Sequence, residues 1–260
     1  MSQFVVDEEL CRKDGICVAV CPSGVLAQGK EGFPEEVPGS RCIACGHCVA
    51  VCPHEALTYT GLPEGELFAA ARELPSAELM DNFLMSRRSV RIYKEKPLAR
   101  ETLEALLEVA RRAPTASNSQ KLHWIVVAGA AKVHALAGET VNWVRGTGKN
   151  PEMVARWEAG RDGVLRGAPA VVVACAPQDY QWGKEDSAIA LSYLELAAEA
   201  RGLGACWAGI LTRVAALHPP LRAALDVPEG YAICGGLMLG ERQYTYRRIP
   251  PRKPLSVQWV

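Results

Sequence analysis

Apolar residues recur at helical spacing in three stretches of the chain. RETLEALLEVARRA (100–113) has this spacing and stops before Pro114. EDSAIALSYLELAAEARG (185–202) keeps it over a longer span and ends at a glycine, a residue that often follows a helix. ELFAAARELPSAELMDNFLMSRR (66–88) has the same character, interrupted at Pro75. These stretches are predicted helices.

Continuous apolar runs mark the predicted strands. They are HWIVVAG (123–129), APAVVVACA (168–176), ACWAGIL (205–211) and YAICGGLMLGE (231–241). Helices and strands alternate irregularly, so the predicted fold is α+β with one central sheet. The final RRIPPRKPLSVQWV (247–260) is too rich in proline for a helix. We expect it to run extended over the surface or over a partner subunit.

The first 60 residues have a different texture, because short elements alternate with glycine and proline. FVVDEE (4–9) and ALTYTG (56–61) are predicted strands, and single helical turns are expected after Cys17 and Cys45. Two half-modules repeat spaced cysteines, Cys-Pro and an apolar exit, with the turn-rich insert QGKEGFPEEVPGS (28–40) between them. GLPEGE (61–66) is a predicted linker. The predicted domains are therefore residues 1–62 and residues 77–260.

The charges divide in the same way. The chain has 29 basic and 29 acidic residues, which argues against a nucleic-acid binder. Residues 1–65 carry four basic and nine acidic side chains, so the rest carries 25 and 20. Opposite net charges of −5 and +5 suggest two modules with different ligands.

Seven of the ten cysteines lie between Cys11 and Cys52. A secreted disulfide scaffold fits poorly, because MSQFVVDEEL lacks the basic and apolar regions of a signal peptide. No apolar run approaches ~18 residues, so no membrane span is expected. The prediction is a cytoplasmic protein, where clustered cysteines usually bind metal.

The second cysteine run is specific. RCIACGHCVAVCP gives Cys42-x2-Cys45-x2-Cys48-x3-Cys52-Pro53, the bacterial pattern for a 4Fe–4S cluster whose fourth cysteine ligates the other cluster of a pair. Structural zinc would favour two separated Cys-x2-Cys pairs and leaves the doubled Cys-Pro unexplained.

The first run has the same spacing, with Asp14 in place of one cysteine: Cys11-x2-Asp14-x2-Cys17-x3-Cys21-Pro22. Cross-ligation pairs Cys42, Cys45 and Cys48 with Cys21 around one cluster. It pairs Cys11, Asp14 and Cys17 with Cys52 around the other. Asp14 either ligates the fourth iron or leaves a 3Fe–4S cluster, since a carboxylate is a harder ligand that can still bind iron. A third reading is a solvated Asp14 beside an empty site. The module resembles two-cluster bacterial ferredoxins.

The remainder carries neither a complete dinucleotide fingerprint nor a Walker lysine loop: GLGACW (202–207) has Trp207 where the third glycine is needed. SRRSVRIY (86–93) could clamp a phosphate, since arginine offers a rigid fork of donors. APTASNSQKLHW (113–124) places many donors and acceptors at one strand entrance. Taken alone, each could be an ordinary basic helix end or polar loop.

In this order, and followed by Gly-Leu-Gly-x-x-Trp-x-Gly (202–209) and Arg-Lys-Pro-Leu (252–255), these motifs resemble the FMN-dependent nitroreductase family over residues 77–260. The resemblance implies an obligate homodimer with FMN at each subunit interface. It implies that Arg87, Arg88 and Ser89 hold the FMN phosphate with Arg252 or Lys253, and that Arg91 lies near the flavin N1–O2 edge. It also implies that Thr115, Ser117, Asn118 and Gln120 contact the ribityl chain and ring edge, and that the Gly209 amide reaches N5. Lys-Leu-His-Trp after Gln120 departs from the common Pro-Trp.

Other reactive side chains receive no role. Cys175, Cys206 and Cys234 lie in apolar strand candidates and are expected to be buried structural thiols. His123 and His218 have no partner that the sequence reveals, and no catalytic acid or base can be identified.

The two modules together predict an FMN oxidoreductase that receives electrons through two iron–sulfur clusters. It would reduce a small electron-poor acceptor: a nitroaromatic, a quinone or an activated alkene. Covalent fusion raises the effective concentration of the electron donor. The donor to the clusters would be an external protein or NAD(P)H, and the acceptor pocket is expected within 138–165. Two alternatives remain open, a redox protein without an organic substrate and a flavin dehydrogenase that passes electrons out through the clusters.

Overall fold

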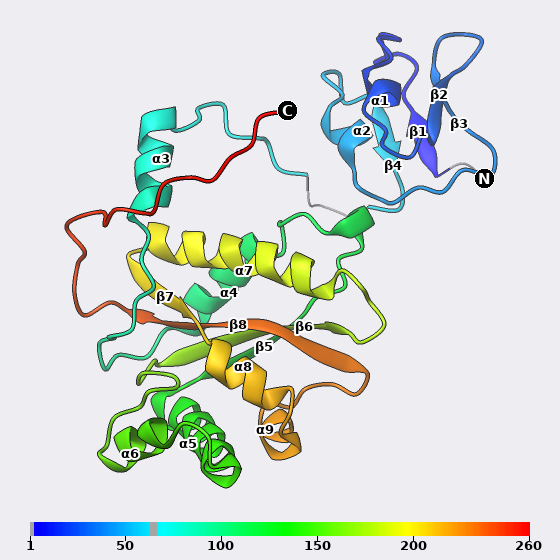
Figure 1. Cartoon of the computed structure of the whole chain (residues 1–260). Helices are drawn as coiled ribbons and strands as arrows, with labels where there is room; N and C mark the ends of the chain where they lie inside the picture. The colour runs from blue at the N-terminus through cyan, green and yellow to red at the C-terminus, as the bar shows by residue number, and fades with distance from the viewer. Residues whose placement is uncertain (1–2, 63–66) are drawn as a thin grey trace. The chain divides into compact units, whose positions relative to one another are not determined.

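The computed structural model describes residues 3–62 and 67–260 (Figure 1). The chain divides into two compact units, residues 1–74 with 117–119, and residues 75–116 with 120–260. Most of the predicted linker at 61–66 lies outside the described residues. No described helix is both long and apolar enough to cross a bilayer.

The N-terminal unit contains two antiparallel strand pairs and two short helices. Strand β1 (Phe4–Val6) pairs with β4 (Leu57–Tyr59), and β2 (Leu26–Gln28) pairs with β3 (Pro34–Glu36). Helices α1 (Ile16–Ala19) and α2 (His47–Ala50) are the expected single turns. The insert predicted to be rich in turns also supplies a strand, β3. A small core includes Phe4, Val25 and Leu57.

The C-terminal unit is a three-layer arrangement around one sheet (Figure 1). The strands are β5 (His123–Ala128), β6 (Ala170–Pro177), β7 (Leu203–Trp207) and β8 (Tyr231–Glu241), in the order β5-β6-β8-β7, with every neighbouring pair antiparallel. Helices α4 (Arg100–Ala110) and α7 (Gly183–Ala200) cover one face. Helices α5 (Ala130–Thr147), α8 (Gly209–Ala215) and α9 (Pro219–Ala224) cover the other, with α6 (Pro151–Glu158) against α5.

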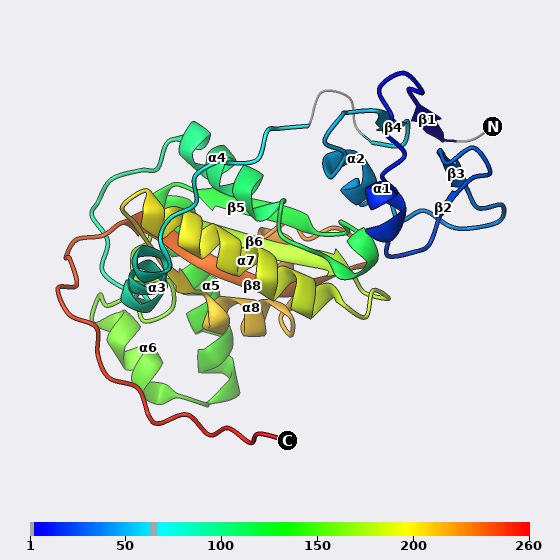
Figure 2. The ribbon, with the colours of Figure 1, turned by 90° about the horizontal axis from the view of Figure 1, so that it is seen from above.

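The central strand β6 is buried on both faces, which explains its uninterrupted run of valine and alanine. Its even-numbered residues, such as Val172, pack with α4 and α7, while odd-numbered residues, such as Val171, face α5 and α8. Alternating side chains of a strand point to opposite faces, so helices on both sides require apolar residues at every position. Figure 1 shows α7 above the sheet, and Figure 2, seen from above, shows α4 and α7 in front of it.

Several predicted elements need correction. In the stretch predicted as a helix over 66–88, helix α3 begins at Ala77, where Ser76 caps it by accepting the Leu79 N–H at 3.2 Å, and residues 67–76 are not helical. The run 205–211 is a strand only to Trp207, and α8 starts at Gly209. Helix α5 was not predicted because Gly138 and Gly146 weaken its pattern. A Cβ at Gly138 would lie 3.2 Å from the Trp157 ring, so this glycine permits α6 to pack closely.

Candidate functional site

The two cysteine runs fold into matching backbones. Gly15 and Gly46 both have φ of 71°, with ψ of 4° and 1°, and each precedes a helical turn. The residues two positions before them, Lys13 and Ala44, are also left-handed, at 56° and 50°. A non-glycine residue with positive φ is uncommon. The internal repeat inferred from the spacing is therefore also a repeat of conformation.

Two hollows lie in this unit, and each is lined by one of the predicted ligand sets. A space of about 350 Å³, counting its open mouth, is bordered by Cys21, Cys42, Cys45 and Cys48. A second, of about 320 Å³, is bordered by Cys11, Asp14, Cys17 and Cys52. Within the described residues no three His, Cys, Asp or Glu side chains converge on a point for a single metal ion. Ligands spread around a hollow fit a polynuclear cluster, in which each iron takes its own ligand.

Backbone amides donate to two of the predicted ligand cysteines. The Val25 N–H donates to Cys21 Sγ at 3.2 Å, and the Ala56 N–H donates to Cys52 Sγ at 3.3 Å, at the matching place in the other half. Burial works against ionisation of Cys21, yet the amides of Val25 and its neighbours outweigh it and lower the pKa of this thiol. The donor set therefore suits iron–sulfur clusters.

The hollow lined by four cysteines also has a tyrosine in its wall. The Tyr59 hydroxyl donates to Gln3 Oε1 at 3.2 Å. Burial is the main reason that the pKa of Tyr59 is raised, and Cys42 lies close enough to contribute to the rise, so the hydroxyl keeps its proton. No motif in the sequence signals this contact.

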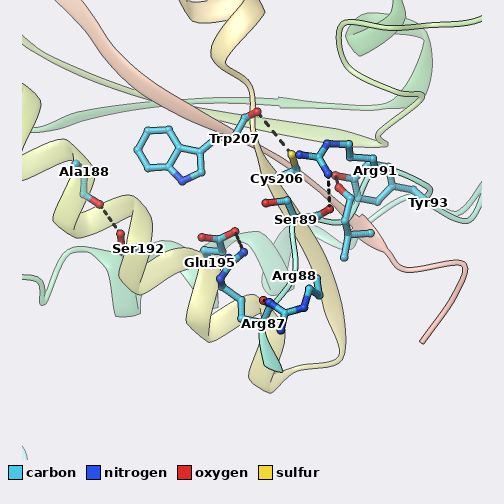
Figure 3. Close-up of polar contacts among 11 residues, drawn as sticks. Arg87, Arg88, Ser89, Arg91, Tyr93, Ala188, Ser192, Glu195, Cys206 and Trp207 are labelled. Atoms are coloured by element: carbon cyan, nitrogen blue, oxygen red, sulfur yellow. Dashed lines mark hydrogen bonds and ion pairs between the residues drawn. The ribbon is translucent and has the colours of Figure 1, made fainter. Parts of the chain in front are cut away.

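The arginines of SRRSVRIY have different surroundings (Figure 3). Arg87 ends helix α3 and its Nη1 lies 2.9 Å from Oε1 of Glu195, on α7. Arg88 donates to the Arg87 and Met85 carbonyl oxygens at 2.7 and 2.6 Å. Its buried Nε has no hydrogen-bond partner in the described chain. An unsatisfied cationic donor beside Ser89 fits an anion such as a phosphate.

The segment that carries Ser89 lies beside the edge strand β7. Ser89 bridges Ala205 in parallel, and the Val90 N–H donates to the Ala205 carbonyl oxygen at 2.9 Å. A Cβ at Gly204 would lie 2.5 Å from Val90 Cγ1, so only glycine permits this approach. Arg91 is exposed and donates to the Ser89 carbonyl oxygen at 3.2 Å.

The polar loop 113–120 has an unusual backbone. Ser117, Asn118 and Gln120 all have positive φ, near 50°. Its two ends are tied together, because the Gln120 N–H donates to Thr115 Oγ1 at 3.1 Å. Strained residues cost of order 1–3 kcal/mol each and concentrate at ligand-binding sites.

A buried carboxylate that the sequence analysis missed anchors this loop. Asp186, on α7, is 3% exposed. Its Oδ1 accepts the Ala116 N–H at 3.0 Å, and its Oδ2 accepts the Tyr180 hydroxyl at 2.5 Å. An acidic residue in the first turn of a helix looks like an ordinary dipole contact, so the sequence offered no signal.

The remaining predicted flavin contacts are more open. Gly209 begins α8, where a Cβ would meet nothing within 4 Å, and Trp207 beside it is 41% exposed. Arg252 and Lys253 lie in the exposed tail. Within the described part of one chain, no hydrogen bond ties the tail to Arg87, Arg88 or Ser89. One subunit thus gathers Arg87, Arg88, Ser89 and Arg91 without the tail.

The three cysteines and two histidines without a predicted role lie outside the predicted cofactor contacts. Cys175 and Cys206 are buried and Cys234 is half-buried. Burial raises the pKa of Cys175 to about 11, so its thiol stays protonated. His218 Nε2 lies 2.8 Å from Glu139 Oε1, and the His123 ring packs against that of Tyr231.

Comparison with known proteins agrees with both modules. Residues 84–241 match the Nitroreductase family model, and residues 3–53 match the 4Fe-4S dicluster domain. An Archaeoglobus fulgidus protein, provisionally described as an NADH dehydrogenase/NAD(P)H nitroreductase, is 29% identical over 60% of this chain and 82% of its own. The chloronitrobenzene nitroreductase of Comamonas testosteroni is 24% identical over 64% and 88%.

A solved structure has the same fold. The nitroreductase of Bacteroides fragilis, determined with bound FMN, aligns with a TM-score of 0.62 at 24% identity, over 71% of this chain and all of that one. These matches confirm the predicted α+β fold with its small N-terminal iron–sulfur domain.

Proposed function

Because the chain belongs to the nitroreductase family and carries an N-terminal 4Fe-4S dicluster domain, we propose that it is an FMN-dependent oxidoreductase fed by two iron–sulfur clusters. Electrons enter through the clusters and leave to a small electron-poor organic acceptor. The observation that carries the proposal is the pair of hollows, each bordered by four potential cluster ligands, in the same chain as a nitroreductase fold.

FMN as the cofactor is supported by the family and by the bound FMN of the Bacteroides fragilis structure. When bound, FMN takes up electrons singly or in pairs and delivers them as a pair. In this proposal Arg88, with its unpartnered Nε, and Ser89 hold the phosphate. Arg87 shares its charge between the phosphate and Glu195.

The polar groups around the ring have separate tasks. The positive charge of Arg91 favours the anionic reduced ring, as a cation near the N1–O2 edge does. Thr115, Ser117, Asn118 and Gln120 bind the ribityl chain and ring edge, with Asp186 holding the loop in place. The Gly209 amide is one of the unpaired N–H groups at the start of α8 and is free to donate to N5.

The clusters supply one-electron transfer. We assign Cys21, Cys42, Cys45 and Cys48 to one cluster, and Cys11, Asp14, Cys17 and Cys52 to the other. Asp14 donates its carboxylate to the fourth iron. A carboxylate carries the same charge as a thiolate but is a harder ligand that favours oxidised iron, so we expect this cluster to have the lower potential.

A homodimer completes the FMN site in this proposal. Helix α3 buries none of its residues within one chain, although Leu79, Met80, Leu84 and Met85 are large and apolar. Leu255 and Trp259 of the tail are at least 90% exposed. Large exposed apolar side chains on one helix and on the tail support an interface at these segments. The tail would then bring Arg252 or Lys253 to a phosphate site.

The acceptor class is a nitroaromatic, a quinone or an activated alkene, with support from relatives described as nitroreductases. A nitro group takes two electrons and two protons to give a nitroso group and water. The protons come from solvent, because no acid or base is identified in the site. The test is anaerobic purification followed by FMN, iron and sulfide analysis and turnover of a nitroaromatic with reduced ferredoxin. Protein without FMN, or without turnover, would sink the proposal.

A further inference from the structure

The C-terminal unit contains a groove whose lining includes none of the residues assigned to FMN. It lies between helix α6, the turn 163–167 and the start of α8, and its empty space is about 580 Å³ including the open mouth. Asn150, Glu152, Arg156, Gly163, Arg166 and Ile210 border it, together with Met153. Two arginines and one carboxylate leave the groove with a net positive charge.

The turn that presents Arg166 is rigidly built. Asp162 accepts three backbone N–H groups, from Val164 and Leu165 at 2.8 and 2.9 Å and from Gly167 at 3.0 Å. Arg166 itself has φ of 59°, a conformation that side chains other than glycine adopt rarely and at a cost. The hydrogen bonds of Asp162 therefore fix the backbone of Arg166 at the edge of the groove.

The opposite wall repeats this feature. Asn150 also has a left-handed φ, of 52°, and its Oδ1 caps α6 by accepting the Met153 N–H at 3.2 Å. The Asn150 amide group therefore keeps its N–H donors for a ligand. Arg156, one turn further on, lies 3.7 Å from Glu152, with side chains 61% and 82% exposed. Such a long, exposed ion pair is weak, so Arg156 can turn to another anion.

The groove adjoins the segment that is predicted to contact the flavin ring. Ile210 directly follows Gly209, the residue assigned to N5. Arg166 lies close enough to act electrostatically on Tyr93 and Cys206, as does Arg91, which is assigned to the N1–O2 edge. A molecule in the groove would therefore lie beside the residue that follows Gly209.

We propose that this groove binds a carboxylate of the acceptor, so that the preferred substrates are negatively charged aromatic nitro compounds. Arg166 and Arg156 bind the carboxylate and Asn150 donates a further hydrogen bond. The inference rests on the proposed function. It goes beyond it by naming the charge of the acceptor and the residues that select it.

The test is isothermal titration of the FMN-loaded protein with 4-nitrobenzoate and with 4-nitrobenzamide, which has a similar shape and no charge. A charge-assisted hydrogen bond is worth roughly tenfold in affinity, so the benzoate should bind at least about ten times more tightly. Arg166→Gln and Arg156→Gln should each remove most of that preference without changing amide binding. Arg100→Gln, on α4 at the other face of the sheet, is the matched control and should change neither.

Equal binding of the two ligands overturns the inference, as does a variant that weakens both alike. Loss of FMN from Arg166→Gln also overturns it, because the arginine would then belong to the flavin. Turnover is measured separately on the same preparations. Protein that binds the benzoate selectively but reduces neither compound supports the groove and contradicts the proposed function, so the two failures are distinguishable.

Discussion

Asp14 and Cys45 occupy the same backbone position in the two halves of the N-terminal unit. Each follows a left-handed residue, Lys13 at 56° or Ala44 at 50°, and each precedes a glycine at 71°. Asp14 Oδ1 accepts the Ile16 N–H at 3.1 Å. The other oxygen is then the atom that can bind iron, at a place where the second half has a thiolate.

The first prediction is that Asp14 holds the fourth iron. Gently prepared protein should contain about eight irons per chain and show no 3Fe–4S signal in EPR of the oxidised state. Asp14→Ala should produce that signal by opening one corner. Asp14→Cys should give two clusters with thiolates only and raise the lower potential. A 3Fe–4S signal in wild type would rule out ligation by Asp14.

The second prediction concerns Tyr59. A polar hydroxyl beside a cluster ligand raises the reduction potential, and Tyr59 lines the same hollow as Cys42, so Tyr59→Phe should lower the potential of the cluster with four cysteines. A hydrogen bond of about 1 kcal/mol corresponds to ~40 mV for one electron. Phenylalanine keeps the ring that packs 4.8 Å from Phe4. An EPR-monitored redox titration measures both clusters, and the cluster at Asp14 is the internal control. If the reduction potentials of both clusters shifted equally, the effect of Tyr59 would not be local.

The third prediction uses the close approach at Gly204. Gly204→Ala places a methyl group 2.5 Å from Val90 Cγ1 and should displace Ser89 from β7. Overpacking of this kind costs about 1–3 kcal/mol. FMN should also dissociate more readily, as measured by ultrafiltration and flavin absorbance. Gly146→Ala, in α5 with open space around the new methyl group, is the control and should leave FMN bound. If Gly204→Ala retained FMN as well as wild type does, the assignment of Ser89 to the FMN phosphate would be wrong.

The fourth prediction concerns the pH dependence of the Arg87–Glu195 pair. Burial raises the pKa of Glu195 even though Arg87 opposes this effect. The native state therefore binds a proton more tightly than the unfolded chain, and stability falls as pH rises from the unfolded pKa through the native one. Arg87→Gln removes the opposing charge, so it should raise the native pKa and widen this interval.

Urea unfolding of the two proteins, followed by tryptophan fluorescence at pH 5 and pH 8, measures the effect. Removing one partner of a buried pair costs about 3–5 kcal/mol, and the Arg87→Gln loss should be smaller at pH 5, where Glu195 can be protonated. Glu195→Gln with Arg87→Gln is the matched control and should lose the pH dependence. A loss that is equal at both pH values would show that Glu195 does not titrate.

The fifth prediction is that the tail supports the dimer. Leu255→Ser with Trp259→Ser removes two apolar side chains that are exposed in one chain. Sedimentation velocity should show wild type as a dimer and a shift toward monomer in the variant, with partial loss of FMN. A wild-type monomer that retains FMN would contradict the interface assignment.

The sequence was most informative where one local rule decides the structure. Strand β8 begins and ends where its apolar run does, and the cysteine spacing separates the residues that line the two hollows. It was less informative where packing decides. Helix α5 contains two glycines, one of which serves contact with Trp157. Asp186 binds a loop residue that lies far from it in the chain, and Tyr59 lies beside Cys42 in the same way. No local sequence pattern indicates either contact.

The central claim is that electrons pass from the clusters to the flavin and then to the acceptor. Anaerobic stopped-flow mixing of the oxidised protein with reduced ferredoxin tests it most directly, with the cluster and flavin absorption bands followed together. The cluster bands should bleach no later than the flavin band, and 4-nitrobenzoate should then restore both. A flavin that is reduced and reoxidised while the cluster bands stay unchanged would contradict it.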